Sequence, residues 1–82
     1  MYFRGKLLQQ GRLILPEVSG DIDEQVSPTG VPSQTGRMEV PPRKVRSGET
    51  YELELDTGRA LTILVWRVEQ PAWIAYFKGT AP

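Results

Sequence analysis

The sequence predicts an all-β protein, a small antiparallel barrel or compact sandwich of five or six strands. Eight glycines and seven prolines are spread over 82 residues, which leaves few windows long enough for a helix. The stretch from Tyr51 to Val68 has the period-two alternation and central turn of a β-hairpin. A short open sheet would leave its edges exposed, so closure is favoured. The length indicates a single domain, residues 1–82.

The N-terminal part predicts a hairpin. Its strands are Phe3 to Gln9 and Arg12 to Leu15, and Gly11 lies in the turn. Pro16 should end or bend the second strand, because proline cannot donate to a β-ladder. A short edge strand is expected at Asp21 to Gln25.

The middle of the chain predicts two loops around one short strand. Residues Ser27 to Gly36 are nearly all turn formers, so we expect the longest loop there, and a mobile one. Arg37 to Val40 alternates polar with apolar residues and predicts a strand with one buried face. Pro41 to Gly48 then predicts a basic loop.

A three-stranded meander is predicted to complete the fold. Gly58 in the turn Asp56-Thr57-Gly58 is free to take positive φ, which allows a tight hairpin. The return strand, Arg59 to Glu69, is apolar on both faces. Leu61, Ile63 and Val65 lie on one, and the other carries Ala60, Thr62, Leu64, Trp66 and Val68.

After a turn at Gln70-Pro71-Ala72, the last strand runs from Trp73 to Lys78. Alternation there separates Trp73 and Phe77 from Ile74 and Tyr76. Because a small domain has one core, one apolar face of this meander needs a further cover.

The Gly-Glu-Thr-Tyr-Glu-Leu-Glu-Leu run followed by Asp-Thr-Gly-Arg resembles small barrels of the SH3-like and OB types. The resemblance covers about a quarter of the chain and implies only the barrel architecture.

Composition argues against catalysis. The chain has no cysteine and no histidine, which removes thiolate chemistry, the commonest general base and the commonest metal ligand. The acidic group Glu17, Asp21, Asp23 and Glu24 lacks the remaining ligands of a calcium loop and is interpreted as a solvated charge run. No phosphate-binding glycine motif occurs. We therefore expect no catalytic residue, no metal and no cofactor.

The first residues lack the long apolar run of a signal peptide, and no run approaches the length of a membrane span. The expected location is cytoplasmic.

Three hypotheses for function remain. The first is a non-catalytic interaction module or structural subunit that binds another protein, or its own copy, through Trp66, Trp73 and Tyr76. A homodimer is its simplest form.

The second is a nucleic-acid-binding barrel that uses Arg37, Arg43, Lys44 and Arg46 beside aromatic side chains. The formal net charge of zero counts against it, and local ion pairing or plain solvation of these cations is the simpler interpretation. The third is a small-ligand binder with a pocket in the barrel mouth, under the loop at 27–36.

Overall fold

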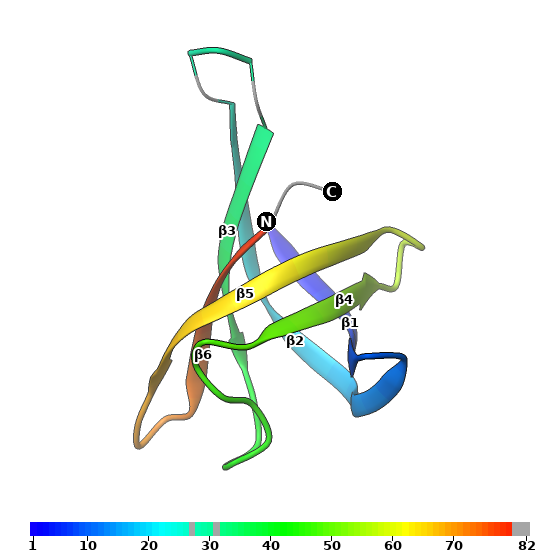
Figure 1. Cartoon of the computed structure of the whole chain (residues 1–82), viewed down its shortest axis with the longest axis vertical. Coiled ribbons are helices and arrows are strands. Elements are labelled where there is room, and N and C mark those ends of the chain that lie inside the picture. Colours follow the sequence, from blue (N-terminus) through cyan, green and yellow to red (C-terminus); the bar gives the residue numbers. More distant parts are fainter. Residues whose placement is uncertain (27, 31, 80–82) are drawn as a thin grey trace.

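The computed structural model describes residues 1–26, 28–30 and 32–79, and these contain six antiparallel strands and no helix, hence no helical membrane span. The strands close into a barrel in the order β1-β2-β3-β6-β5-β4, which confirms the predicted all-β barrel (Figure 1). Their bounds are Tyr2–Gln9 (β1), Arg12–Val26 (β2), Pro32–Glu39 (β3), Thr50–Leu55 (β4), Ala60–Glu69 (β5) and Ile74–Gly79 (β6).

Two three-stranded meanders build the barrel. One is β1-β2-β3, and the other is the predicted C-terminal meander β4-β5-β6. They join along two seams, where β1 pairs with β4 and β3 pairs with β6. No strand edge is left open around the body of the barrel, which is the expected benefit of closure.

The N-terminal hairpin is confirmed. Its two-residue turn has positive φ at Gln10 and at Gly11, 52° and 77°, as a tight hairpin turn requires. Pro16 does not end β2. It lies where Gly5 pairs with Val18 but Leu7 pairs with Leu15, so β2 carries an extra residue there and bulges. Because Pro16 lies in this bulge, β2 does not end there and continues to Val26.

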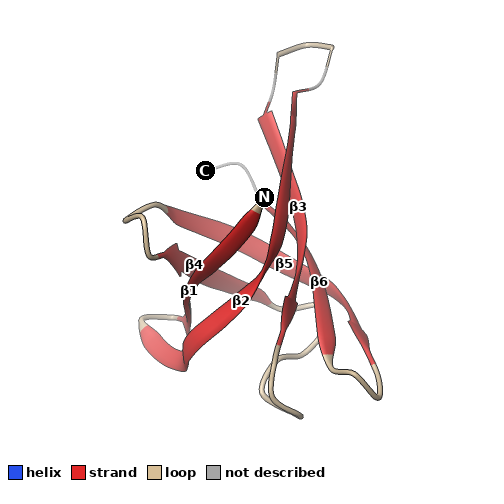
Figure 2. Ribbon diagram, turned by 180° about the vertical axis from the view of Figure 1, so that it is seen from behind, coloured by secondary structure: helices blue, strands red, loops and turns tan. Residues whose placement is uncertain are grey.

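The predicted loop at 27–36 is too long, because β3 already begins at Pro32. Ser27 and Val31 of that loop lie outside the described residues. Main-chain pairing of Val26 with Pro32 and Asp23 with Thr35 extends β2 and β3 as a two-stranded ribbon. The ribbon projects well beyond the body of the barrel (Figures 1 and 2). The edge strand predicted at Asp21 to Gln25 is part of this continuous β2.

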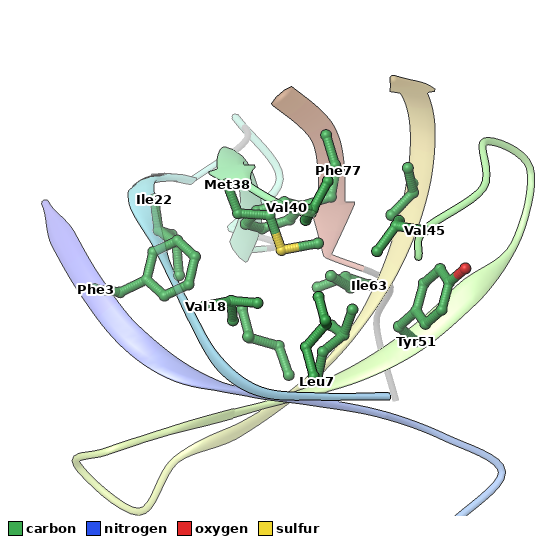
Figure 3. Packing of buried hydrophobic residues seen from close by; sticks show 14 of the residues in the cluster. Phe3, Leu7, Val18, Ile22, Met38, Val40, Val45, Tyr51, Ile63 and Phe77 are labelled. Atoms are coloured by element: carbon green, nitrogen blue, oxygen red, sulfur yellow. The ribbon is translucent and has the colours of Figure 1, made fainter. Parts of the chain in front are cut away.

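The barrel interior is filled with apolar side chains from all six strands and from the β3–β4 connection (Figure 3). Phe3 and Phe77 meet edge to face, with ring centroids 6.0 Å apart. Val45 is buried and brings the predicted basic loop onto the core. The core side chains are Phe3, Leu7, Leu15, Val18, Ile22, Met38, Val40, Val45, Tyr51, Leu53, Leu55, Ile63, Val65, Ala75 and Phe77.

Candidate partner-binding surface

Trp66 lies at a β-bulge on the outside of the barrel. Val65 pairs with Phe77 and Arg67 with Tyr76, so Trp66 is an extra residue in β5 with no direct partner on β6. Its side chain is 52% exposed, next to the fully buried Val65. The bulge also shifts the alternation of the strand. Val68, which the sequence pattern placed on the face of Trp66, therefore packs against the core instead.

Tyr76 supports Trp66 from the neighbouring strand. The two ring centroids lie 5.8 Å apart with the planes inclined at 45°. The guanidinium of Arg67 lies 5.9 Å from the centroid of the Tyr76 ring, and its Nη2 is 3.5 Å from a carboxylate oxygen of Glu69. The exposed indole thus contacts the Tyr76 ring, and that ring in turn contacts the guanidinium of Arg67.

Register places further residues on the same outer face. Arg37 of β3 pairs with Tyr76, and Lys78 of β6 pairs with Leu64 of β5. Directly paired residues project to the same side of a sheet. We call this surface the Trp66 face, and it consists of Arg37, Leu64, Trp66, Arg67, Tyr76 and Lys78.

Trp73 does not belong to this face. It precedes β6 in the β5–β6 turn, with φ of 55°, and its half-buried ring packs against the core. Its carbonyl accepts a hydrogen bond from the Val40 amide. The three predicted partner-binding residues therefore separate: Trp66 and Tyr76 lie together on the outside, and Trp73 closes one end of the core.

The basic loop predicted at 41–48 lies in the β3–β4 connection, residues 40–49, and the end of this loop is hydrogen-bonded to β5 beside the Trp66 face. The Gly48 amide donates to the Val65 carbonyl at 2.6 Å, and the Val65 amide donates to the Glu49 carbonyl at 3.0 Å. The end of the loop therefore lies against the residue that precedes Trp66. Loop and β5–β6 turn both lie at the end of the barrel away from the ribbon (Figure 1).

The buried Tyr51 side chain is hydrogen-bonded to two residues of this loop. Its hydroxyl accepts a hydrogen bond from the Arg46 amide at 3.0 Å and donates to the Glu49 carboxylate at 2.9 Å. Burial raises the pKa of the Tyr51 phenol; the hydrogen bond from the Arg46 amide acts in the opposite direction, and the Glu49 carboxylate adds to the rise. The Arg46 side chain therefore projects from a point where a hydrogen bond to Tyr51 holds the backbone.

The four predicted nucleic-acid-binding cations remain exposed. Arg43, Lys44 and Arg46 project from the loop, whereas Arg37 lies on β3 within the Trp66 face. Within the described ranges, the ion pairs join Lys6 to Glu54, Arg59 to Glu24 and Arg67 to Glu69. Local ion pairing, one of the two simpler interpretations of these cations, is therefore not found, and they are solvated charges.

Strand order separates the charges of this neutral chain into two halves. The basic half comprises β3, β6, β5 and the connections at 40–49 and 70–73, and it has six basic and three acidic side chains, a net charge of +3. The remaining strands β4, β1 and β2 with their turns form the acidic half, with four basic and seven acidic side chains, a net charge of −3. The basic half carries Arg37, Arg43, Lys44, Arg46, Arg67 and Lys78 against Glu39, Glu49 and Glu69.

Sequence reasoning missed Arg67, Lys78 and this division. Charges far apart in the chain meet only through the β3–β6 seam, and no local pattern signals that seam. The Trp-Arg dipeptide at 66–67 was the one local signal that could have pointed to Arg67 as part of this surface.

The predicted acidic group lies along β2. Within the described part of the chain, no three acidic side chains come close enough together to hold a metal ion. Buried side chains of the described residues fill the barrel interior, and the β2–β3 ribbon projects away from the body of the barrel (Figure 2). An open hollow of about 660 Å³ lies instead on the outside of the acidic half, bordered by charges of both signs that include the ion pair Lys6–Glu54.

The fold and surface define a closed six-stranded antiparallel barrel with one aromatic and basic outer face. Comparison with protein-family models, with curated proteins and with solved structures gave no match.

Proposed function

We propose that the chain is a non-catalytic binding module that contacts another protein through the Trp66 face. The observation that carries the proposal is the exposed indole of Trp66, 52% accessible and supported by Tyr76. Tryptophan, tyrosine and arginine are the residues most enriched among those that dominate binding energy at protein interfaces. Trp66, Tyr76 and Arg67 bring all three types together.

A different protein is the favoured partner, in preference to a second copy. A twofold dimer places the same surface on both sides of the interface. Pairing through the Trp66 face would bring Arg37, Arg67 and Lys78 of one copy close to the same cations of the other. The basic halves of the two copies would repel each other in that arrangement, since like charges across an interface are unfavourable.

Nucleic-acid binding is the second candidate function. The exposed cations Arg43, Lys44 and Arg46, which form no ion pair with any described residue, support it together with the exposed Trp66. Its expected signature is binding of single-stranded oligonucleotides that weakens steeply as salt rises, because phosphate contacts release counterions.

Site-specific photo-crosslinking tests the first candidate. A photoreactive phenylalanine analogue at position 66 is compared with the same analogue at Leu13, which is also 52% exposed but lies on β2 in the acidic half. We expect an adduct with a partner protein from position 66 and none from position 13. An excess of unlabelled wild-type chain should prevent this adduct, whereas an excess of the Trp66→Ala chain should not. The same adducts from both positions would contradict the proposal.

A further inference from the structure

From the charge and register of the Trp66 face we infer that the bound partner contributes an acidic, extended polypeptide segment. This inference rests on the proposed function and names the chemistry of the partner. The basic half, which contains the exposed indole, has a net charge of +3 in a chain of zero formal net charge. A surface of one sign steers and aligns a partner of the opposite sign.

The cations that would meet this segment are available. Arg37, Arg43, Lys44 and Arg46 are exposed and take part in no ion pair within the described residues. Carboxylates of a partner can bind them without first breaking a contact inside the barrel. The planar guanidinium groups of the three arginines suit bidentate binding of carboxylates.

Register gives the spacing of the contacts. Arg37, Tyr76 and Arg67 are direct neighbours across β3, β6 and β5, so the two guanidinium-bearing positions lie two strand spacings apart, roughly 10 Å. An extended chain rises about 3.3 Å per residue, so two acidic residues about three positions apart can reach both, and the one at Arg67 replaces the exposed ion pair with Glu69. An apolar or aromatic residue between them would then lie against the exposed ring of Trp66.

The aromatic geometry favours a polypeptide over a nucleic acid. Single-stranded nucleic acid binds to successive open ring faces, one for each base. Trp66 is the one strongly exposed aromatic side chain in the described basic half, whereas Tyr76 is half-buried beneath Arg67.

Fluorescence anisotropy with three probes tests the inference. The first is a labelled peptide with pairs of Glu and Asp around a central Phe, the second is the same peptide with Gln and Asn in their place, and the third is oligothymidylate. We expect the acidic peptide to bind most tightly and to weaken as salt rises, as surface ion pairs do. Trp66→Ala, and separately the triple change Arg43→Gln, Lys44→Gln, Arg46→Gln, should each weaken binding about tenfold, about 1.4 kcal/mol.

The matched control is Lys6→Gln with Arg12→Gln in the acidic half, which should leave the affinity unchanged. Equal affinity for the acidic and amide peptides, or equal weakening by the control pair, would overturn the inference. Tighter binding of oligothymidylate would overturn it in favour of the second candidate function. If no probe binds but the adduct at position 66 forms, the proposed function stands and the acidic partner is wrong.

Discussion

Trp66 of β5 and Tyr76 of β6 lie in ring contact on the outside of the barrel, with centroids 5.8 Å apart. Tyr76 pairs in register with Arg67, the residue after the bulge, so the bulge itself sets the position of the indole. The contact holds a large apolar group at the surface in a defined orientation. A binding surface that is already ordered loses less conformational entropy when a partner arrives.

The first prediction concerns the stability cost of removing this surface. Trp66→Ala should lower the free energy of unfolding by about 1 kcal/mol or less, because the indole is 52% exposed and makes one aromatic contact outside the core. Ile63→Val, which removes a single methyl group from a fully buried position, should cost about as much, roughly 1 kcal/mol. Urea unfolding measures both. A loss of several kcal/mol in Trp66→Ala would show that the indole belongs to the core.

The second prediction concerns the close approach of β2 to β3 at Gly20. A Cβ on Gly20 would meet the Arg37 carbonyl oxygen and would lie 2.8 Å from the Met38 Cα, all backbone atoms of β3. Gly20→Ala should therefore force the strands apart and cost several kcal/mol, on the order of the larger single-residue effects. Thermal unfolding followed by circular dichroism gives the comparison.

The matched control is Gly58→Ala, which has open space around the new methyl group but a φ of 93°. It should cost only about 1–2 kcal/mol of backbone strain. A larger cost at Gly58 than at Gly20 would refute the steric account of β2 and β3.

The third prediction concerns Tyr51 and the loop at 40–49. Tyr51→Phe leaves the ring in place but removes the hydroxyl that bonds the Arg46 amide and Glu49. The expected loss is about 1–2 kcal/mol of unfolding free energy, as for a hydrogen-bonded group at a partly buried site. Faster hydrogen exchange should follow at the Arg46 amide, and slower or unchanged exchange there would count against the anchoring role.

The raised pKa of Tyr51 adds a pH dependence. The unfolded chain loses the phenol proton at the ordinary value of 10.0, below the pKa in the folded state. The folded state therefore binds more protons in the window above about pH 10, and stability falls as the pH rises through it. Below about pH 10 the contribution of the Tyr51 phenol to the free energy of unfolding is fully present. Urea midpoints across this range should fall more steeply for wild type than for Tyr51→Phe, and parallel curves would exclude the linkage.

The fourth prediction concerns the ion pair between Arg59 and Glu24, which joins the β4–β5 turn to the ribbon at 2.5 Å. Both side chains are about half exposed, so solvent screens the pair. Glu24→Gln should change the unfolding free energy by less than about 1 kcal/mol. A calorimetric scan that showed a much larger loss would mean that the ribbon depends on this contact.

The strands with strong local patterns could be predicted from the sequence. Alternation at Tyr51, Leu53 and Leu55 and the glycines at turns located both hairpins, because side-chain period and positive φ are local properties. β3 was underestimated at its start, since Ser33 and Thr35 bury little and are held by main-chain pairing to β2. Such pairing depends on a partner strand and leaves no period in the sequence.

The candidate surface was half predictable. Of the three residues singled out as partner-binding, Trp66 and Tyr76 lie together on the outside, whereas Trp73 packs against the core, and Val68 was assigned to the wrong face. The bulge at Trp66 causes the second error, and a single extra residue in a strand cannot be recognised from composition. The separation of charge required the order of the strands around the barrel.

Partner binding through the Trp66 face is tested most directly by nitrogen-edited proton NMR. The two tryptophan indole N–H signals are followed while the acidic peptide, or the partner identified by crosslinking, is added. The chain has two tryptophans, one exposed on the Trp66 face and one packed on the core. We expect the Trp66 signal to shift on saturation and the Trp73 signal to stay in place. Binding that leaves the Trp66 signal in place, or that shifts Trp73 alone, would contradict this expectation.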